Sequence, residues 1–181
     1  MQKWDELQQD MRTAFLDGAP GMLVSATVWI IAGVVCLKLG IEKAIWTLLI
    51  GGALIHPVSL VLLKLLGRSA KASTGNPLNS LAFATTIWLI VCCVFAYGLS
   101  RMNVAWFFPA MMLAIGSRYL TFHSLFGRRH YWFCGGALIA AGYLCAAQGI
   151  SPALAALVGG GVEALFALAL LAGSKPAPAV S

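Results

Sequence analysis

Apolar runs of about twenty residues constrain this chain more than any other feature of its sequence. The run Val104–Gly127 is the most informative, because it is long enough to cross a bilayer and yet contains Arg118 and His123. A hydrocarbon core about 30 Å thick is crossed by roughly 20 helical residues. Of the 181 residues, 60% are apolar and only 10% are charged, too few charges for the surface of a soluble domain. The sequence therefore predicts a polytopic membrane protein.

The fold class expected is all-α, a membrane-embedded bundle of six transmembrane helices within residues 18–173. The expected spans lie at about residues 22–39, 44–66, 80–99, 104–126, 131–148 and 152–172. Polar or turn-forming residues separate these apolar runs. Residues 174–181 form a proline-rich tail that we expect to be disordered.

Residues 1–17 have the pattern of an amphipathic helix. Trp4, Leu7, Met11 and Phe15 recur at steps of three and four, with charged residues between them. We expect this helix to lie in the membrane interface before the first span. A cytosolic helix that binds a partner protein is the alternative.

Basic residues are distributed unevenly between the two ends of the expected spans. Six spans place both termini on one side, and nine of the 12 Lys and Arg residues fall on that side. The positive-inside rule then predicts that both termini are cytoplasmic. The basic residues are scattered between apolar runs, so the net charge of +6 indicates a membrane face rather than a nucleic-acid partner.

Three ionisable side chains are expected at similar depths inside the spans. Counted from the outer face at 1.5 Å per residue, Glu163 lies at about 16 Å, His56 at about 18 Å and Arg118 at about 21 Å. An ionisable group at the bilayer centre costs ~2.5 to 3.5 kcal/mol on insertion scales, and such groups usually pair or bind ions. We therefore predict that these three side chains meet in a polar substrate- or ion-binding site. In the alternative, Arg118 reaches towards the interface and Glu163 only ties helices together.

Several prolines and glycines fall within the expected spans, near this polar layer. Pro57 removes a backbone donor and predicts a kink beside His56, and Pro109 falls in the fourth span. The triple glycine 159–161 (Gly159, Gly160 and Gly161) favours local unwinding just before Glu163. Small residues at steps of four from Ala155 to Ala167 predict that Glu163 faces a neighbouring helix.

Catalytic and metal chemistry is not indicated. The five cysteines have no C-x-x-C spacing, and the histidines and acidic residues form no ligand set, so we expect neither a metal nor a cofactor. Ser117, His123 and Ser124 point to different faces of one helix and lack a nucleophile elbow. We expect a protein that is not an enzyme.

Three segments carry a resemblance to a known group of proteins. They are AFLDGAPGMLVSATVWIIAG, GGALIHPVSLVLLKLLGRS with the following NPLN, and WFFPAMMLAIGSRYL. Between Ala14 and about Phe126 the chain resembles small bacterial integral membrane proteins classed as a domain of unknown function. The resemblance implies a six-helix bundle in the bacterial inner membrane with no assigned reaction. It also implies histidine in the region of Arg118 and an aromatic residue at the position of His56. This chain differs at both places, which weakens the case that the polar layer has the same role throughout the group.

The function expected from these features is binding or transport of a small solute or ion at the mid-membrane polar site. The alternative is an accessory or scaffolding membrane protein whose polar residues are structural. The expected partners are the lipid bilayer, the solute or ion and, through glycine-rich helix faces, a second copy of the chain.

Overall fold

Seven α-helices make up most of residues 3–173, the part of the chain that the computed structural model describes, and no strand occurs in that range. Two short 3₁₀ turns, Leu16–Gly18 and Val104–Trp106, precede α2 and α5. The helices are α1 (Trp4–Phe15), α2 (Ala19–Leu39), α3 (Ile41–Leu65), α4 (Leu78–Met102), α5 (Phe107–Phe126), α6 (His130–Ala147) and α7 (Pro152–Gly173). The all-helical fold class is confirmed, whereas the expected disordered tail lies outside the described residues.

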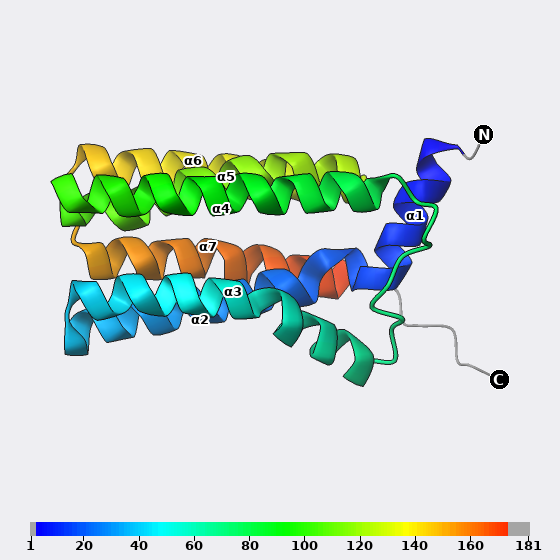
Figure 1. Ribbon diagram of the computed structural model, residues 1–181, viewed down its shortest axis with the longest axis horizontal. Helices are drawn as coiled ribbons and strands as arrows, with labels where there is room; N and C mark the ends of the chain where they lie inside the picture. The colour runs from blue at the N-terminus through cyan, green and yellow to red at the C-terminus, as the bar shows by residue number, and fades with distance from the viewer. Residues whose placement is uncertain (1–2, 174–181) are drawn as a thin grey trace.

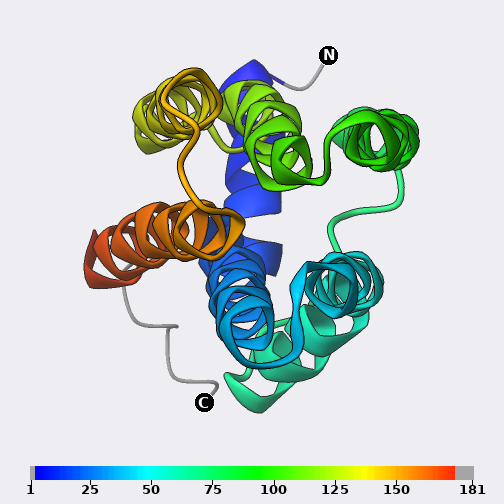
Figure 2. The ribbon, with the colours of Figure 1, turned by 90° about the vertical axis from the view of Figure 1, so that its left-hand side faces the viewer.

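The six long helices lie side by side, and α1 crosses one end of the bundle (Figure 1). Helix α2 packs between α3 and α7, and α5 packs between α4 and α6. Viewed along the bundle, α3 and α4 stand at its edge, each packed mainly on one neighbour (Figure 2). The end of α7 lies at the same end of the bundle as α1.

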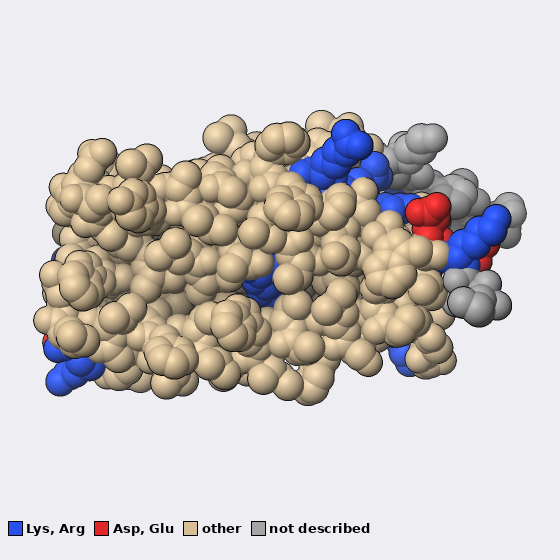
Figure 3. Space-filling model, turned by 90° about the horizontal axis from the view of Figure 1, so that it is seen from above, with Lys and Arg blue, Asp and Glu red and all other residues tan. Residues whose placement is uncertain are grey.

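Four helical segments of residues 3–173 are long and apolar enough to cross a membrane. They are Trp4–Leu39, which includes α1, and the helices Ile41–Leu65, Leu78–Met102 and Pro152–Gly173. Charged side chains gather at the two ends of the bundle, with one basic group in the middle of an otherwise uncharged surface (Figure 3). The fold therefore fits an integral membrane protein. Each expected span overlaps one helix, but a count of six spans stays a prediction.

Close packing of α2 on α7 depends on glycines. A Cβ atom on Gly160 would lie 2.8 Å from the Ile30 side chain and 3.1 Å from the Ala26 carbonyl oxygen, and one on Gly159 would lie 3.0 Å from the Trp29 ring. Small residues let helix backbones approach closely in a membrane. Helix α7 runs unbroken through Gly159, Gly160 and Gly161, so the expected unwinding is not observed, and the first two glycines serve close packing instead.

The two prolines inside the expected spans have different effects. Pro57 lies within α3, and Figure 1 shows this helix bending so that its last turns leave the bundle. Pro109 lies in the first turn of α5, where its missing N–H group would have no partner within the helix. The kink expected near Pro57 is therefore present, whereas Pro109 stands where a helix accepts proline without a kink.

A sharp corner joins α1 to α2, and an ion pair fixes it. Leu16, Asp17 and Gly18 have φ values of 50°, 54° and 80°, all in the left-handed region. The Arg128 guanidinium donates from Nε to Asp17 Oδ1 over 2.9 Å and from Nη2 to Oδ2 over 3.1 Å. The Tyr131 hydroxyl donates to the Asp17 carbonyl oxygen over 2.6 Å. The hydrogen bond and charge of Asp17 raise the pKa of Arg128.

Polar contacts also join α1 to the connection between α3 and α4. The Asn76 side chain donates to Asp10 Oδ2 over 2.8 Å and to the Leu7 carbonyl oxygen over 3.0 Å. The Ser73 backbone N–H donates to the same Asp10 oxygen over 2.9 Å, and its hydroxyl donates to Asp10 Oδ1 over 3.1 Å. The hydrogen bond from Asn76 is the main reason why the pKa of Asp10 is lowered.

The lowered pKa of Asp10 predicts that α1 loosens from this connection in acid. A carboxylate whose pKa is lower in the folded protein stabilises the fold at pH values above its ordinary pKa of 3.8. This stabilisation is lost as the pH falls through the pKa that the group has in the folded protein. Hydrogen exchange at the Ser73 amide should therefore show protection at neutral pH that disappears in acid. Asp10→Asn should weaken protection at neutral pH and flatten the pH profile. The same steep profile in Asp10→Asn would contradict this assignment.

Candidate polar site in the helix core

Of the six acidic residues in the chain, Glu163 alone lies in the middle of a long helix. Its side chain is fully buried, with an exposed fraction of 0%. Oε1 accepts a hydrogen bond from the Tyr119 hydroxyl over 2.9 Å. Ser25 on α2 lies next to the carboxyl group, but Oε2 has no partner at hydrogen-bonding distance among the described residues. The core thus contains a carboxyl group with one oxygen bonded and one unpaired.

Small residues position Glu163 towards the centre of the bundle. Ala155, Gly159 and Ala167 precede or follow it at steps of four, and all three are buried. Residues at this spacing share one face of a helix. On α2, Trp29 packs against Gly159 one turn from Glu163, and its indole nitrogen also has no partner among the described residues. The predicted burial of this face of α7 is confirmed.

Arg118 lies near Glu163 but points elsewhere. It directly precedes Tyr119, and successive residues on a helix diverge by about 100°. Its Nη2 atom donates to the Thr86 hydroxyl on α4 over 3.1 Å, and its guanidinium carbon lies 5.1 Å from the Phe122 ring centroid. Arg118 is close enough to act electrostatically on Glu163, but no ion pair joins these two described side chains. Arg118 is therefore a nearby charge rather than a direct partner.

The comparisons with known proteins identify the family. A family model matches residues 4–173, nearly the whole chain. The chain belongs to the family of unknown function DUF7010. This confirms the resemblance to a domain of unknown function. No curated protein and no solved structure matches the chain.

His56 lies outside the core site of this DUF7010 protein. It lines a separate hollow of about 360 Å³ together with residues of α1, α3, α4 and the connection between α3 and α4, and neither Glu163 nor Arg118 is among the lining residues. Helix α3 packs mainly on α2, and His56 is exposed. The prediction that three side chains meet is therefore wrong for His56. Glu163 and Arg118 lie near each other, and His56 lies in a different pocket.

Two tyrosines complete the DUF7010 core, and our sequence reasoning missed both. Tyr119 binds Glu163, and its ring centroid lies 5.8 Å from that of Tyr131, which is itself fully buried. A buried tyrosine usually directs its hydroxyl to a partner. The position of Tyr119 in the middle of an expected span, next to Arg118, could therefore have indicated a partner for Glu163. In the described residues no group of three or more His, Cys, Asp or Glu is placed to hold a metal ion.

Proposed function

We propose that this protein is a six-span inner-membrane protein that binds a small ion at Glu163, and that the ion is a proton. The observation that carries the proposal is the buried carboxyl group, which has one oxygen bonded to Tyr119 and the other unpaired. An ionised carboxylate without a direct counter-charge is costly in such a core. Binding a proton removes this charge.

The packing around Glu163 favours a proton, rather than a larger ion or solute, as the bound ligand. The side chain has no exposed surface, and Trp29 packs against α7 one turn away. A hydrated metal ion or an organic solute needs a cavity with several ligands, whereas a proton needs no additional space. Arg118, with Nε unpaired, lies between this core and Thr86, which is exposed on α4. We propose that Arg118 and Tyr119 lie beside the path by which a proton reaches Glu163. We propose no catalytic reaction at this site.

The orientation of the protein is part of this proposal. The end of the bundle with α1 is proposed to face the cytoplasm, because most basic residues lie at that end. The exposed apolar faces of α3 and α4 are proposed to contact lipid or, in a homodimer, a second copy of the chain.

A structural role is the second candidate function. The hydrogen bond between Tyr119 and Glu163 joins α5 to α7, and a bond of this kind can hold helices together in a membrane. A scaffolding protein would keep such a bond without exchanging protons.

Proton flux into proteoliposomes separates the two candidates. Under an imposed membrane potential, the wild-type protein should acidify liposomes that contain a pH-sensitive dye. Glu163→Gln should lower this rate about tenfold or more, because the amide accepts from Tyr119 but takes up no proton. Glu42→Gln, at the exposed start of α3, should behave like wild type. Equal rates in wild type, Glu163→Gln and empty liposomes would leave Glu163 with only the structural role.

A further inference from the structure

A pocket beneath the connection between α3 and α4 combines cationic, polar and apolar side chains from three parts of the fold. His56 and Leu60 come from α3, Phe15 ends α1, and the remaining lining residues belong to the connection and the start of α4. The complete lining is Phe15, His56, Leu60, Ala70, Lys71, Ala72, Thr74 and Asn79. This pocket is distinct from the core site at Glu163.

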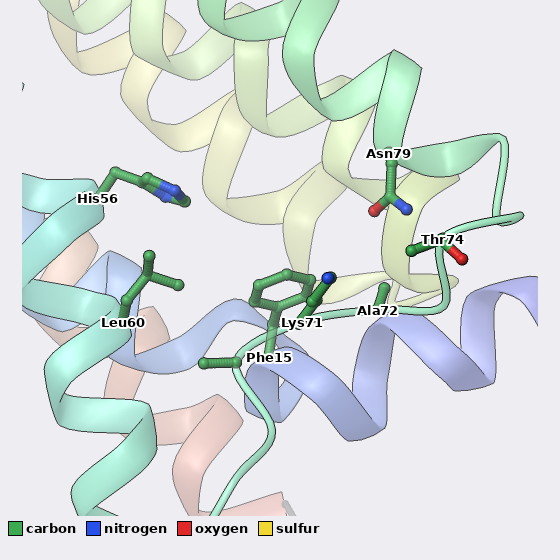
Figure 4. Close-up of a pocket in the computed structure, with 8 residues that line it drawn as sticks. Phe15, His56, Leu60, Lys71, Ala72, Thr74 and Asn79 are labelled. Carbon is green, nitrogen blue, oxygen red and sulfur yellow. The ribbon is translucent and has the colours of Figure 1, made fainter.

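The polar groups of the pocket suit an anion. Figure 4 shows His56 and Lys71 pointing into the same space from α3 and from the connection, with Asn79 on the opposite side. None of the described lining residues is acidic. The nearest carboxylate along α1, Asp10, is already bound by Ser73 and Asn76. An ammonium group, an imidazole and an amide are groups that bind phosphate oxygens.

The apolar part of the pocket suits the chain of an amphiphile. The Phe15 and Leu60 side chains form its apolar wall, whereas Val58, Val61 and Leu65, with exposed fractions of 46%, 59% and 79%, lie on the opposite face of α3 from His56. The bend of α3 turns its last turns away from the bundle (Figure 1). A headgroup in the pocket would therefore place the start of its acyl chains beside Phe15 and Leu60.

The position and size of the pocket agree with a lipid headgroup. It lies at the end of the bundle that carries α1, where the chain has most of its basic residues. Its volume of about 360 Å³ is within the range of small-ligand sites. Basic pockets beside transmembrane helices on the cytoplasmic side commonly bind anionic headgroups. We propose that this pocket binds the phosphate group of an anionic phospholipid through Lys71 and His56.

Thermal unfolding of the delipidated protein in detergent tests this proposal. Phosphatidylglycerol should raise the unfolding temperature of wild type, whereas phosphatidylcholine and inorganic phosphate should have little effect. Lys71→Ala should weaken the apparent affinity for phosphatidylglycerol roughly fivefold. The double variant Lys71→Ala/His56→Ala should have a still lower affinity. Lys71→Arg, which keeps the charge, and Lys38→Ala, at the opposite end of the bundle, should match wild type.

Three results would overturn the proposal. Equal affinities in wild type and Lys71→Ala/His56→Ala, or equal stabilisation by phosphatidylcholine, would show that the pocket does not select an anionic headgroup. Stabilisation by inorganic phosphate as strong as that by phosphatidylglycerol would assign the pocket to a soluble anion. Both residues are exposed, so the alanine variants should fold, and their circular dichroism checks this.

Discussion

Tyr119→Phe is expected to destabilise the protein more than Glu163→Gln, although both changes replace one polar group. Phenylalanine removes the hydrogen bond that Oε1 of Glu163 accepts from the Tyr119 hydroxyl. The buried carboxyl group then loses this partner, which costs about 1–3 kcal/mol. Glutamine retains the acceptor oxygen and the shape of the side chain, so Glu163→Gln should cost less than 1 kcal/mol. Denaturant unfolding in mixed micelles measures both values.

A double variant shows whether the hydrogen bond causes this difference. Tyr119→Phe combined with Glu163→Leu replaces both partners with apolar groups, which is nearly neutral when the shape is kept. The double variant should therefore recover about 1 kcal/mol or more relative to Tyr119→Phe alone. Simple additivity of the two single changes would contradict a direct coupling between α5 and α7.

Gly18→Ala is expected to cost about 3 kcal/mol or more. Gly18 has a φ of 80°, and a Cβ atom there would collide with the Tyr131 hydroxyl and lie 3.1 Å from the Phe126 ring. The left-handed conformation alone costs an L-residue roughly 1–2 kcal/mol. Moving Tyr131 also breaks its hydrogen bond to the Asp17 carbonyl oxygen, which adds about 1 kcal/mol. The unfolding temperature of the purified variant measures the loss.

Gly67→Ala is the matched control. Gly67 has a φ of 70°, but nothing lies within 4 Å of the position that its Cβ atom would occupy. Only the backbone cost of about 1–2 kcal/mol is then expected. If Gly18→Ala and Gly67→Ala destabilise equally, the contact with Tyr131 contributes nothing to the corner between α1 and α2.

The helices and the burial of Glu163 could be predicted because both follow from local sequence and the cost of charge in lipid. Runs of apolar residues mark the helices, and the small residues spaced four apart mark the face that carries Glu163. The partner of Glu163 could not be predicted in the same way. Depth along the bilayer is readable from the sequence, but the direction of a side chain around its helix depends on which helices pack together. This is why Arg118 was predicted and Tyr119, one residue further, was missed.

The position of His56 shows the same limit. The depth expected for His56 matched the depth expected for Glu163, but α3 packs mainly on α2, and His56 lines another pocket, at the end of the bundle with α1. The ion pair of Asp17 and Arg128 was also not predicted, because these residues are 111 positions apart. Only the packed ends of α1, α5 and α6 bring them together.

The infrared spectrum of the reconstituted protein tests the central claim most directly, because a protonated carboxyl group has its own C=O stretching band. At neutral pH, where exposed carboxyl groups are ionised, we predict such a band in wild type and in Glu42→Gln, its loss in Glu163→Gln, and its disappearance in wild type as the pH is raised. A folded wild-type protein without this band at neutral pH, or a band that persists in Glu163→Gln at that pH, would contradict proton binding at Glu163.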